Sequence, residues 1–93
     1  MLSKIPIDID KIKSDDIDKE ILRAALIAEL DAINLYEEMA AIAKSDLIKK
    51  VLLDVAKEEK EHVGEFQTLL LRFDIEQVEE IEEGKKEVEE LID

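Results

Sequence analysis

Residues 57–62 read Lys-Glu-Glu-Lys-Glu-His and contain the only histidine of this 93-residue chain. Glu59 and His62 stand three positions apart, so on an α-helix they point to the same side. At about 100° per residue, the apolar side chains around them fall within about 60° of Glu59. These are Ile48, Leu52, Val55, Val63, Phe66, Leu70 and Phe73. A carboxylate and an imidazole therefore lie in the middle of the apolar side of a predicted helix.

Glu59 is energetically out of place on this apolar side. An ionised carboxylate that leaves water without a partner loses its solvation, and the cost is large unless a counter-charge replaces it. A metal ion is the partner that Glu59 and His62 can share, and Glu-x-x-His is the spacing of carboxylate-bridged di-iron and di-manganese sites in helix bundles. The motif alone is common in acidic helical proteins, so its position on the apolar side carries the metal prediction.

The composition restricts the class of protein. Apolar residues make up 46% of the chain and charged residues 42%, while glycine and proline together contribute only three residues, which favours an all-α fold. The net charge of −13 argues against nucleic acid and anionic membranes as partners. The absence of cysteine excludes disulfides and thiol chemistry within this chain. We expect one small, soluble, cytoplasmic helical domain with no membrane span.

The N-terminal part of the chain divides into an arm and a long helix. Residues 1–13 are irregular, and we expect an extended arm that lies across a neighbouring subunit. Ser14 or Asp15 is the expected N-cap of a helix that runs from Ile17 to about Lys44 without a helix breaker.

A second helix follows a short polar connection at residues 44–46, with Ser45 as its expected cap, and continues to Arg72 or Phe73. Because the loop is so short, the two helices are predicted to pack as an antiparallel hairpin.

A short third helix is expected after the hairpin. Residues 74–77 read Asp-Ile-Glu-Gln and resemble a capping box. We expect this helix to reach about Glu82 and to end at Gly84. The hairpin and the third helix thus form one unit, residues 14–83. Residues 84–93 remain as a charged tail, for which a frayed helix and a linker are the alternatives.

The first helix, like the second, carries a carboxylate on its predicted apolar side. Its predicted inner side is apolar apart from Glu29 and Tyr36, and it comprises Leu22, Ala25, Glu29, Ile33, Tyr36 and Ala40. Glu29 lies about 15 residues before the turn and Glu59 about 14 after it, at a rise of about 1.5 Å per residue. The two carboxylates are therefore predicted at nearly the same height of the hairpin.

The metal site predicted from one chain is incomplete. Glu29, Glu59 and His62 supply three ligands from one side, whereas a complete di-metal carboxylate site takes a Glu from two helices and Glu-x-x-His from two others. Two copies related by a two-fold axis provide that set. A second apolar surface on the first helix, at residues 26, 27 and 30, also favours an oligomer. The alternative explanation of that surface is a bent or broad core face.

The motifs at residues 28–36 and 58–62, Ala-Glu-Leu-Asp-Ala-Ile-Asn-Leu-Tyr and Glu-Glu-Lys-Glu-His, resemble those of the encapsulated ferritins. The resemblance covers about residues 14–78. It is especially close to the archaeal type, in which the ferritin domain precedes an encapsulin shell domain in one polypeptide. It implies a half-ferritin that completes a four-helix ferritin-like bundle by dimerisation, and a ring-shaped decamer of five dimers.

The resemblance also implies roles for particular residues. Glu29, Glu59 and His62 from two chains would hold two irons across the dimer interface. Tyr36 would lie beside the irons, where it could bind a ligand or donate an electron, although a purely structural core tyrosine is an equal alternative. Asp31 falls where the family carries an acidic residue at a metal-entry site.

The function expected from this resemblance is that of a ferroxidase, which oxidises Fe²⁺ to Fe³⁺ for storage inside an encapsulin nanocompartment. The sequence departs from the family pattern in two ways. Residues 89–93 lack the short apolar-basic tag by which free-standing members are loaded into encapsulin shells, and these 93 residues contain no shell domain. One alternative is a structural acidic oligomerisation module, in which Glu59 and His62 form a buried polar pair. Another is a peroxide reductase like rubrerythrin, although the Cys-x-x-Cys pairs of its usual form are missing.

Overall fold

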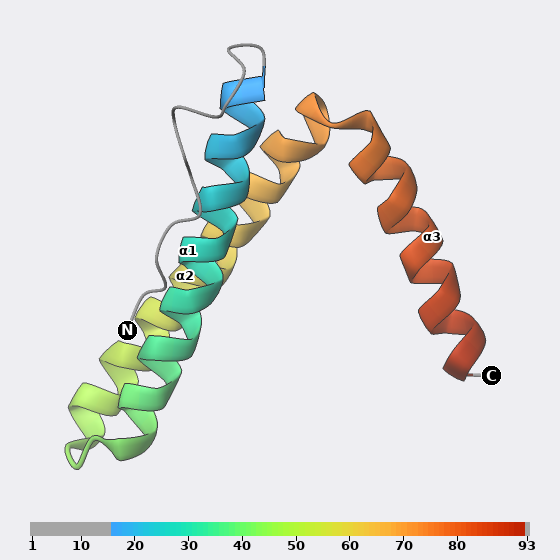
Figure 1. Ribbon diagram of the computed structural model, residues 1–93. Coiled ribbons are helices and arrows are strands. Elements are labelled where there is room, and N and C mark those ends of the chain that lie inside the picture. Colours follow the sequence, from blue (N-terminus) through green and yellow to red (C-terminus); the bar gives the residue numbers. More distant parts are fainter. Residues whose placement is uncertain (1–15, 93) are drawn as a thin grey trace.

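The computed structural model of the chain describes residues 16–92, which fold into three α-helices. These are α1, Ile17–Ile42; α2, Asp46–Phe73; and α3, Ile75–Ile92. Helices α1 and α2 lie side by side and antiparallel, and α3 leaves the end of α2 and points away from the pair (Figure 1). The all-α hairpin with a third helix is confirmed. Its completion to a four-helix bundle by a second chain remains a prediction.

Two sequence predictions concern the N-terminus. The proposed arm, residues 1–13, and the proposed helix caps, Ser14 and Asp15, lie outside the described residues. Asp16 directly precedes α1, and its side chain makes no capping hydrogen bond.

The turn between α1 and α2 is fixed by local hydrogen bonds. The backbone N–H of Ala43 donates to the carbonyl oxygen of Met39 at 2.9 Å, which closes the last turn of α1. The hydroxyl of Ser45 accepts a hydrogen bond from the backbone N–H of Ile48 at 3.3 Å. Ser45 is therefore the N-cap of α2, as predicted, because it satisfies one of the free N–H groups at the start of the helix.

The buried apolar side chains of the two long helices are small or aliphatic. They are Leu22, Ala24, Ile33 and Ala40 on α1 and Ala56 and Leu70 on α2. Ala40 and Ala56 are the most buried of these, which is consistent with a close approach of the two backbones. Within residues 16–92 no large side chain is completely buried, so the hairpin has only a thin core and leaves much apolar surface uncovered.

Helix α3 is longer than the sequence indicated. It continues through Gly84 to Ile92, so the expectation that it ends at Gly84 was wrong, and residues 84–92 are helical. A glycine inside a helix costs only about 1 kcal/mol relative to alanine, and Gly84 adopts no positive φ. Strong helix formers surround it, and Lys86 pairs with Glu83 across it at 3.4 Å.

None of the helices in this part of the chain carries an apolar stretch of the length needed to cross a bilayer.

Candidate metal centre

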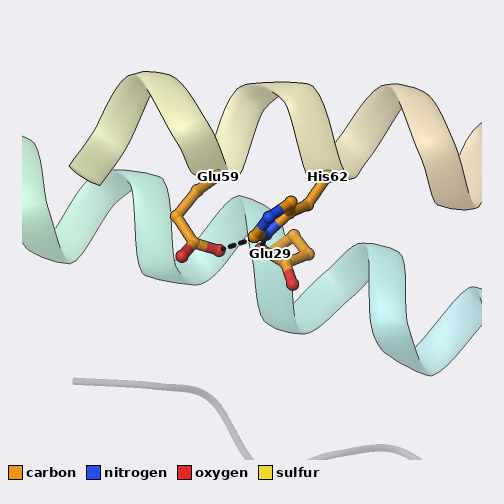
Figure 2. Close-up of side chains that lie close together, drawn as sticks. All are labelled: Glu29, Glu59 and His62. Carbon is orange, nitrogen blue, oxygen red and sulfur yellow. Dashed lines mark ion pairs between the residues drawn. The ribbon is translucent and has the colours of Figure 1, made fainter. Parts of the chain in front are cut away.

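Three side chains from two helices converge halfway along the hairpin. Glu29 comes from α1, and Glu59 and His62 come from the facing side of α2 (Figure 2). One potential ligand atom from each residue lies within 4.8 Å of those of the other two. The Nδ1 atom of His62 is 3.4 Å from Oε2 of Glu29 and 3.4 Å from Oε2 of Glu59. Both carboxylates therefore point at the same imidazole.

The lengths of the two helices explain this meeting. Glu29 lies at the middle of α1 and Glu59 at the middle of α2, and the helices are joined by a short turn. Residues equally distant from the turn of an antiparallel hairpin reach the same height. One helical turn after Glu59, His62 projects from the same side of α2. The prediction that the three side chains share one level of the hairpin is confirmed.

The two carboxylates of the cluster are poorly compensated. The side chains of Glu29 and Glu59 are each 19% exposed, and that of His62 is 44% exposed. Among the described residues, Oε2 of Glu29 is buried and receives no hydrogen bond, although His62 is near. No lysine or arginine of residues 16–92 pairs with either carboxylate. Lys60, which follows Glu59 in the sequence, pairs with Glu37 at 3.0 Å. Within residues 16–92, the partly buried carboxylates of Glu29 and Glu59 thus share one imidazole, an arrangement that a bound cation would stabilise.

This donor set fits a divalent transition metal. Carboxylate oxygens supply hard anionic ligands and the imidazole supplies a nitrogen ligand, a combination that suits iron and manganese. The oxygen of Glu29 that lacks a hydrogen bond has a free position for such an ion. Glu29, Glu59 and His62 would hold it.

The other two residues singled out in the sequence lie outside this cluster. Asp31 is half-buried and follows Glu29 by two positions, about 200° around the helix. Asp31 does not belong to the cluster of Glu29, Glu59 and His62. Tyr36 is half-buried on α1, two turns after Glu29. Their proposed roles in metal entry and in electron or ligand transfer stay predictions. No further Asp, Glu or His of the described chain joins Glu29, Glu59 and His62 in this cluster.

Comparisons with known proteins agree with this architecture. The sequence profile described as rubrerythrin matches residues 20–92. The chain is 62% identical over 72 residues to a ferritin-like-encapsulin shell fusion protein of Pyrococcus furiosus. That match covers 77% of this chain and 21% of the relative, so the chain spans about a fifth of the length of that protein.

The crystal structure of the encapsulated ferritin domain from Pyrococcus furiosus superposes on the chain with a TM-score of 0.83 at 55% sequence identity. The superposition covers 98% of this chain and 95% of that domain. The resemblance to encapsulated ferritins is thereby confirmed. Because the rubrerythrin profile matches most of the sequence, including nearly all of the three helices, the chain belongs to the rubrerythrin family, with a ferritin-like fold.

Proposed function

We propose that this chain is a ferroxidase that oxidises Fe²⁺ to Fe³⁺ at a di-iron site shared between two copies. The observation that carries the proposal is the buried oxygen of Glu29 that receives no hydrogen bond from the described residues, within a cluster of Glu29, Glu59 and His62. A buried carboxylate oxygen without a donor is costly unless a ligand occupies it.

A second copy is needed because three ligands on one side cannot enclose two metal ions. The surface around His62 supports such a pairing. Four large apolar side chains of α2, between 44% and 56% exposed, lie within about 40° of His62 around the helix. They are Ile48, Val51, Leu69 and Phe73. A two-fold axis beside His62 would cover these side chains and bring together two sets of Glu29, Glu59 and His62. The ring of five such dimers implied by the family resemblance is part of the same proposal.

In this proposal Fe²⁺ is the substrate. Four carboxylates from two copies carry four negative charges, which two Fe²⁺ ions would balance, so neutral imidazoles complete the site. Each ion loses one electron to dioxygen or peroxide, and the hard carboxylate oxygens also suit the Fe³⁺ product. Tyr36 would bind a ligand or donate an electron beside the irons, and Asp31 would bind arriving iron.

The similar Pyrococcus protein supports a proposal for the destination of the oxidised iron. The similar Pyrococcus protein is a fusion of a ferritin-like part with an encapsulin shell. We propose that this chain likewise works in the cytoplasm inside an encapsulin nanocompartment, joined to or associated with the shell protein. A hairpin with so thin a core has no interior for a mineral, so storage requires a separate container.

Peroxide reduction is the second candidate, and the rubrerythrin profile favours it. The two functions differ in the preferred oxidant. This chain has no cysteine, so it cannot itself provide the thiolate-bound iron that would return electrons to the site. A purely structural oligomerisation module is the third candidate, and it predicts no specific iron binding.

An anaerobic Fe²⁺ titration, followed by light scattering, tests the shared site. We expect tight binding to saturate at about two ions per dimer, and we expect dimers and larger rings to increase with iron because the metal binds only paired chains. Mn²⁺ is a suitable redox-silent control. Tight binding of two irons to a monomer would contradict the shared site, and absence of specific binding would favour the structural module.

The same iron-loaded protein then separates the two oxidoreductase functions. Exposure to dioxygen and, separately, to hydrogen peroxide is followed by the absorbance of Fe³⁺. Rapid oxidation by dioxygen is expected of a ferroxidase. Rapid oxidation by peroxide together with negligible reaction with dioxygen would support a peroxide reductase instead.

A further inference from the structure

An ion pair joins the first turns of α1 to the junction between α2 and α3. The guanidinium Nη2 of Arg23 donates a hydrogen bond to Oδ2 of Asp74 at 2.8 Å. The two residues are 51 positions apart in the sequence, and Asp74 is only 8% exposed. Asp74 is also the single non-helical residue between α2 and α3. This contact therefore connects α1 directly to the point where the chain changes direction.

Both carboxylate oxygens of Asp74 are engaged, each with a different helix. While Oδ2 receives the Arg23 guanidinium of α1, Oδ1 accepts a hydrogen bond from the backbone N–H of Gln77 at 3.1 Å. The second contact makes Asp74 the N-cap of α3, as its sequence predicted. One side chain at the end of α2 thus holds the start of α3 and the side of α1 together.

Little else fixes the direction of α3. None of its residues is buried. It contacts α2 only close to the junction, and its backbone does not approach α1 (Figure 1). Only Gln77 and Ile81 of α3 are partly buried, and a helix with so little buried surface has little packing to define its angle to the hairpin. The direction of α3 must come from the junction itself.

The charges around Asp74 keep this contact formed. The backbone N–H of Gln77 lowers the pKa of Asp74 most, and the Arg23 guanidinium and the nearby charge of Lys19 lower it further, against the opposing effect of burial. Asp74 is therefore ionised at neutral pH. Glu20 is the other acidic group beside Arg23, at 3.5 Å from Nη1, and it leaves Nη2 free for Asp74.

We propose that Arg23 and Asp74 form a latch that sets the direction in which α3 leaves the hairpin. Both are positioning residues, and neither lies in the metal cluster. The latch matters because α3 carries strongly exposed apolar side chains near its end, Val88, Leu91 and Ile92. The direction of α3 determines where this apolar surface meets another molecule. The proposal is independent of any activity of the metal centre.

Two substitutions remove the contact between Arg23 and Asp74 while Asp74 or its replacement can still cap α3. Arg23→Met keeps the aliphatic stem and removes the guanidinium, and it leaves Asp74 free to cap α3. Asp74→Asn keeps one oxygen as an acceptor for the cap, since asparagine caps helices about as well as aspartate. It also removes the second oxygen and the charge. Glu20→Gln is the matched control, because it alters the other partner of Arg23 without touching Asp74.

The distance between α1 and α3 reports the direction of α3. Because the chain has no cysteine, the changes Glu38→Cys and Glu87→Cys place two spin labels at exposed positions on the two helices. Labelled chains are mixed with a large excess of unlabelled chains, so that pulsed electron paramagnetic resonance measures distances within one chain. We expect one narrow distance distribution in the parent and in Glu20→Gln. In Arg23→Met and Asp74→Asn we expect a distribution broadened roughly twofold or more.

Circular dichroism and Fe²⁺ binding complete the test. The latch predicts unchanged helix content and unchanged iron stoichiometry in Arg23→Met, since only the direction of α3 is released. If α3 loses helix content in Asp74→Asn, Arg23→Met alone decides the question. A parent-like narrow distribution in Arg23→Met would overturn the proposal. So would an equal broadening in the Glu20→Gln control.

Discussion

The hairpin and α3 both consist of amphipathic helices, yet only the hairpin buries apolar side chains. Both parts consist of charged helices with apolar residues at helical spacing. Helices α1 and α2 cover each other, whereas Ile75, Leu91 and Ile92 of α3 are 75–86% exposed. The difference arises because the turn at Ser45 folds α2 back onto α1, while the junction at Asp74 directs α3 away. An amphipathic pattern makes a helix, but a core requires a partner.

The two regions also differ in whether a carboxylate oxygen receives a hydrogen bond. At the junction, the oxygens of Asp74 receive hydrogen bonds from Arg23 and Gln77. In the hairpin, Oε2 of Glu29 receives none from the described residues. A satisfied carboxylate stabilises a structure, whereas an unsatisfied one is suited to a ligand from outside the chain.

We expect the largest effect from substitutions in the cluster that contains the Glu29 carboxylate. In the proposed two-fold site, each of Glu29→Ala and His62→Ala would remove two ligands, so we predict that iron oxidation slows by more than about 100-fold. The measurement is the initial rate of Fe³⁺ formation after aeration. Glu58→Ala is the control, because Glu58 is exposed beside Glu59 on α2, and it should keep the parent rate. A parent rate in either ligand variant would assign the cluster a structural role.

The second prediction compares a buried residue of the hairpin with an exposed residue of α3. Leu70→Ala removes methyl groups from a side chain that is 5% exposed, and it should lower the free energy of unfolding by about 2–3 kcal/mol. Val88→Ala changes a side chain that is 58% exposed, and it should cost less than about 0.5 kcal/mol. Urea denaturation followed by circular dichroism gives both values. A comparable loss in Val88→Ala would reveal that another copy covers α3.

The third prediction compares the two helical glycines, Gly64 in α2 and Gly84 in α3. A Cβ atom at either position would meet no atom within 4 Å. Replacement by alanine should therefore stabilise each helix by up to about 1 kcal/mol through the higher helix propensity of alanine. Thermal unfolding checks this expectation. Destabilisation by only one of the two changes would indicate that another molecule approaches closely at that glycine.

The smallest effect concerns the pH dependence of the junction. The pKa of Asp74 is held below its ordinary value of 3.8, chiefly by the hydrogen bond from Gln77 and further by Arg23. A depressed carboxyl pKa contributes stability that is present above the unfolded pKa and is lost as the pH falls through the folded pKa. The junction should therefore be unchanged from neutral pH down to about pH 5 and weaken only below about pH 4.

Carbon NMR of the Asp74 carboxyl group measures this titration, and Arg23→Met should raise its midpoint. An ordinary midpoint in the parent, or no change in Arg23→Met, would mean that Arg23 does not stabilise the ionised carboxylate.

The sequence by itself determined the two long helices, the turn between them and the meeting of Glu29, Glu59 and His62. Periodicity placed Glu59 and His62 on one side of α2, and the rise per residue placed Glu29 opposite them. The cap at Ser45 was also predictable, because a capping hydrogen bond spans only three residues. These features depend on local geometry, which repeats regularly along the chain.

The tertiary structure decided which apolar residues are buried and where α3 points. Ile48 and Phe73 belong to the same apolar side of α2 as Leu70, yet they are exposed while Leu70 is buried, because α1 covers only part of that side. The pairing of Arg23 with Asp74 joins residues 51 positions apart. No local pattern encodes such a contact, since it depends on how two helices and a junction are placed in space.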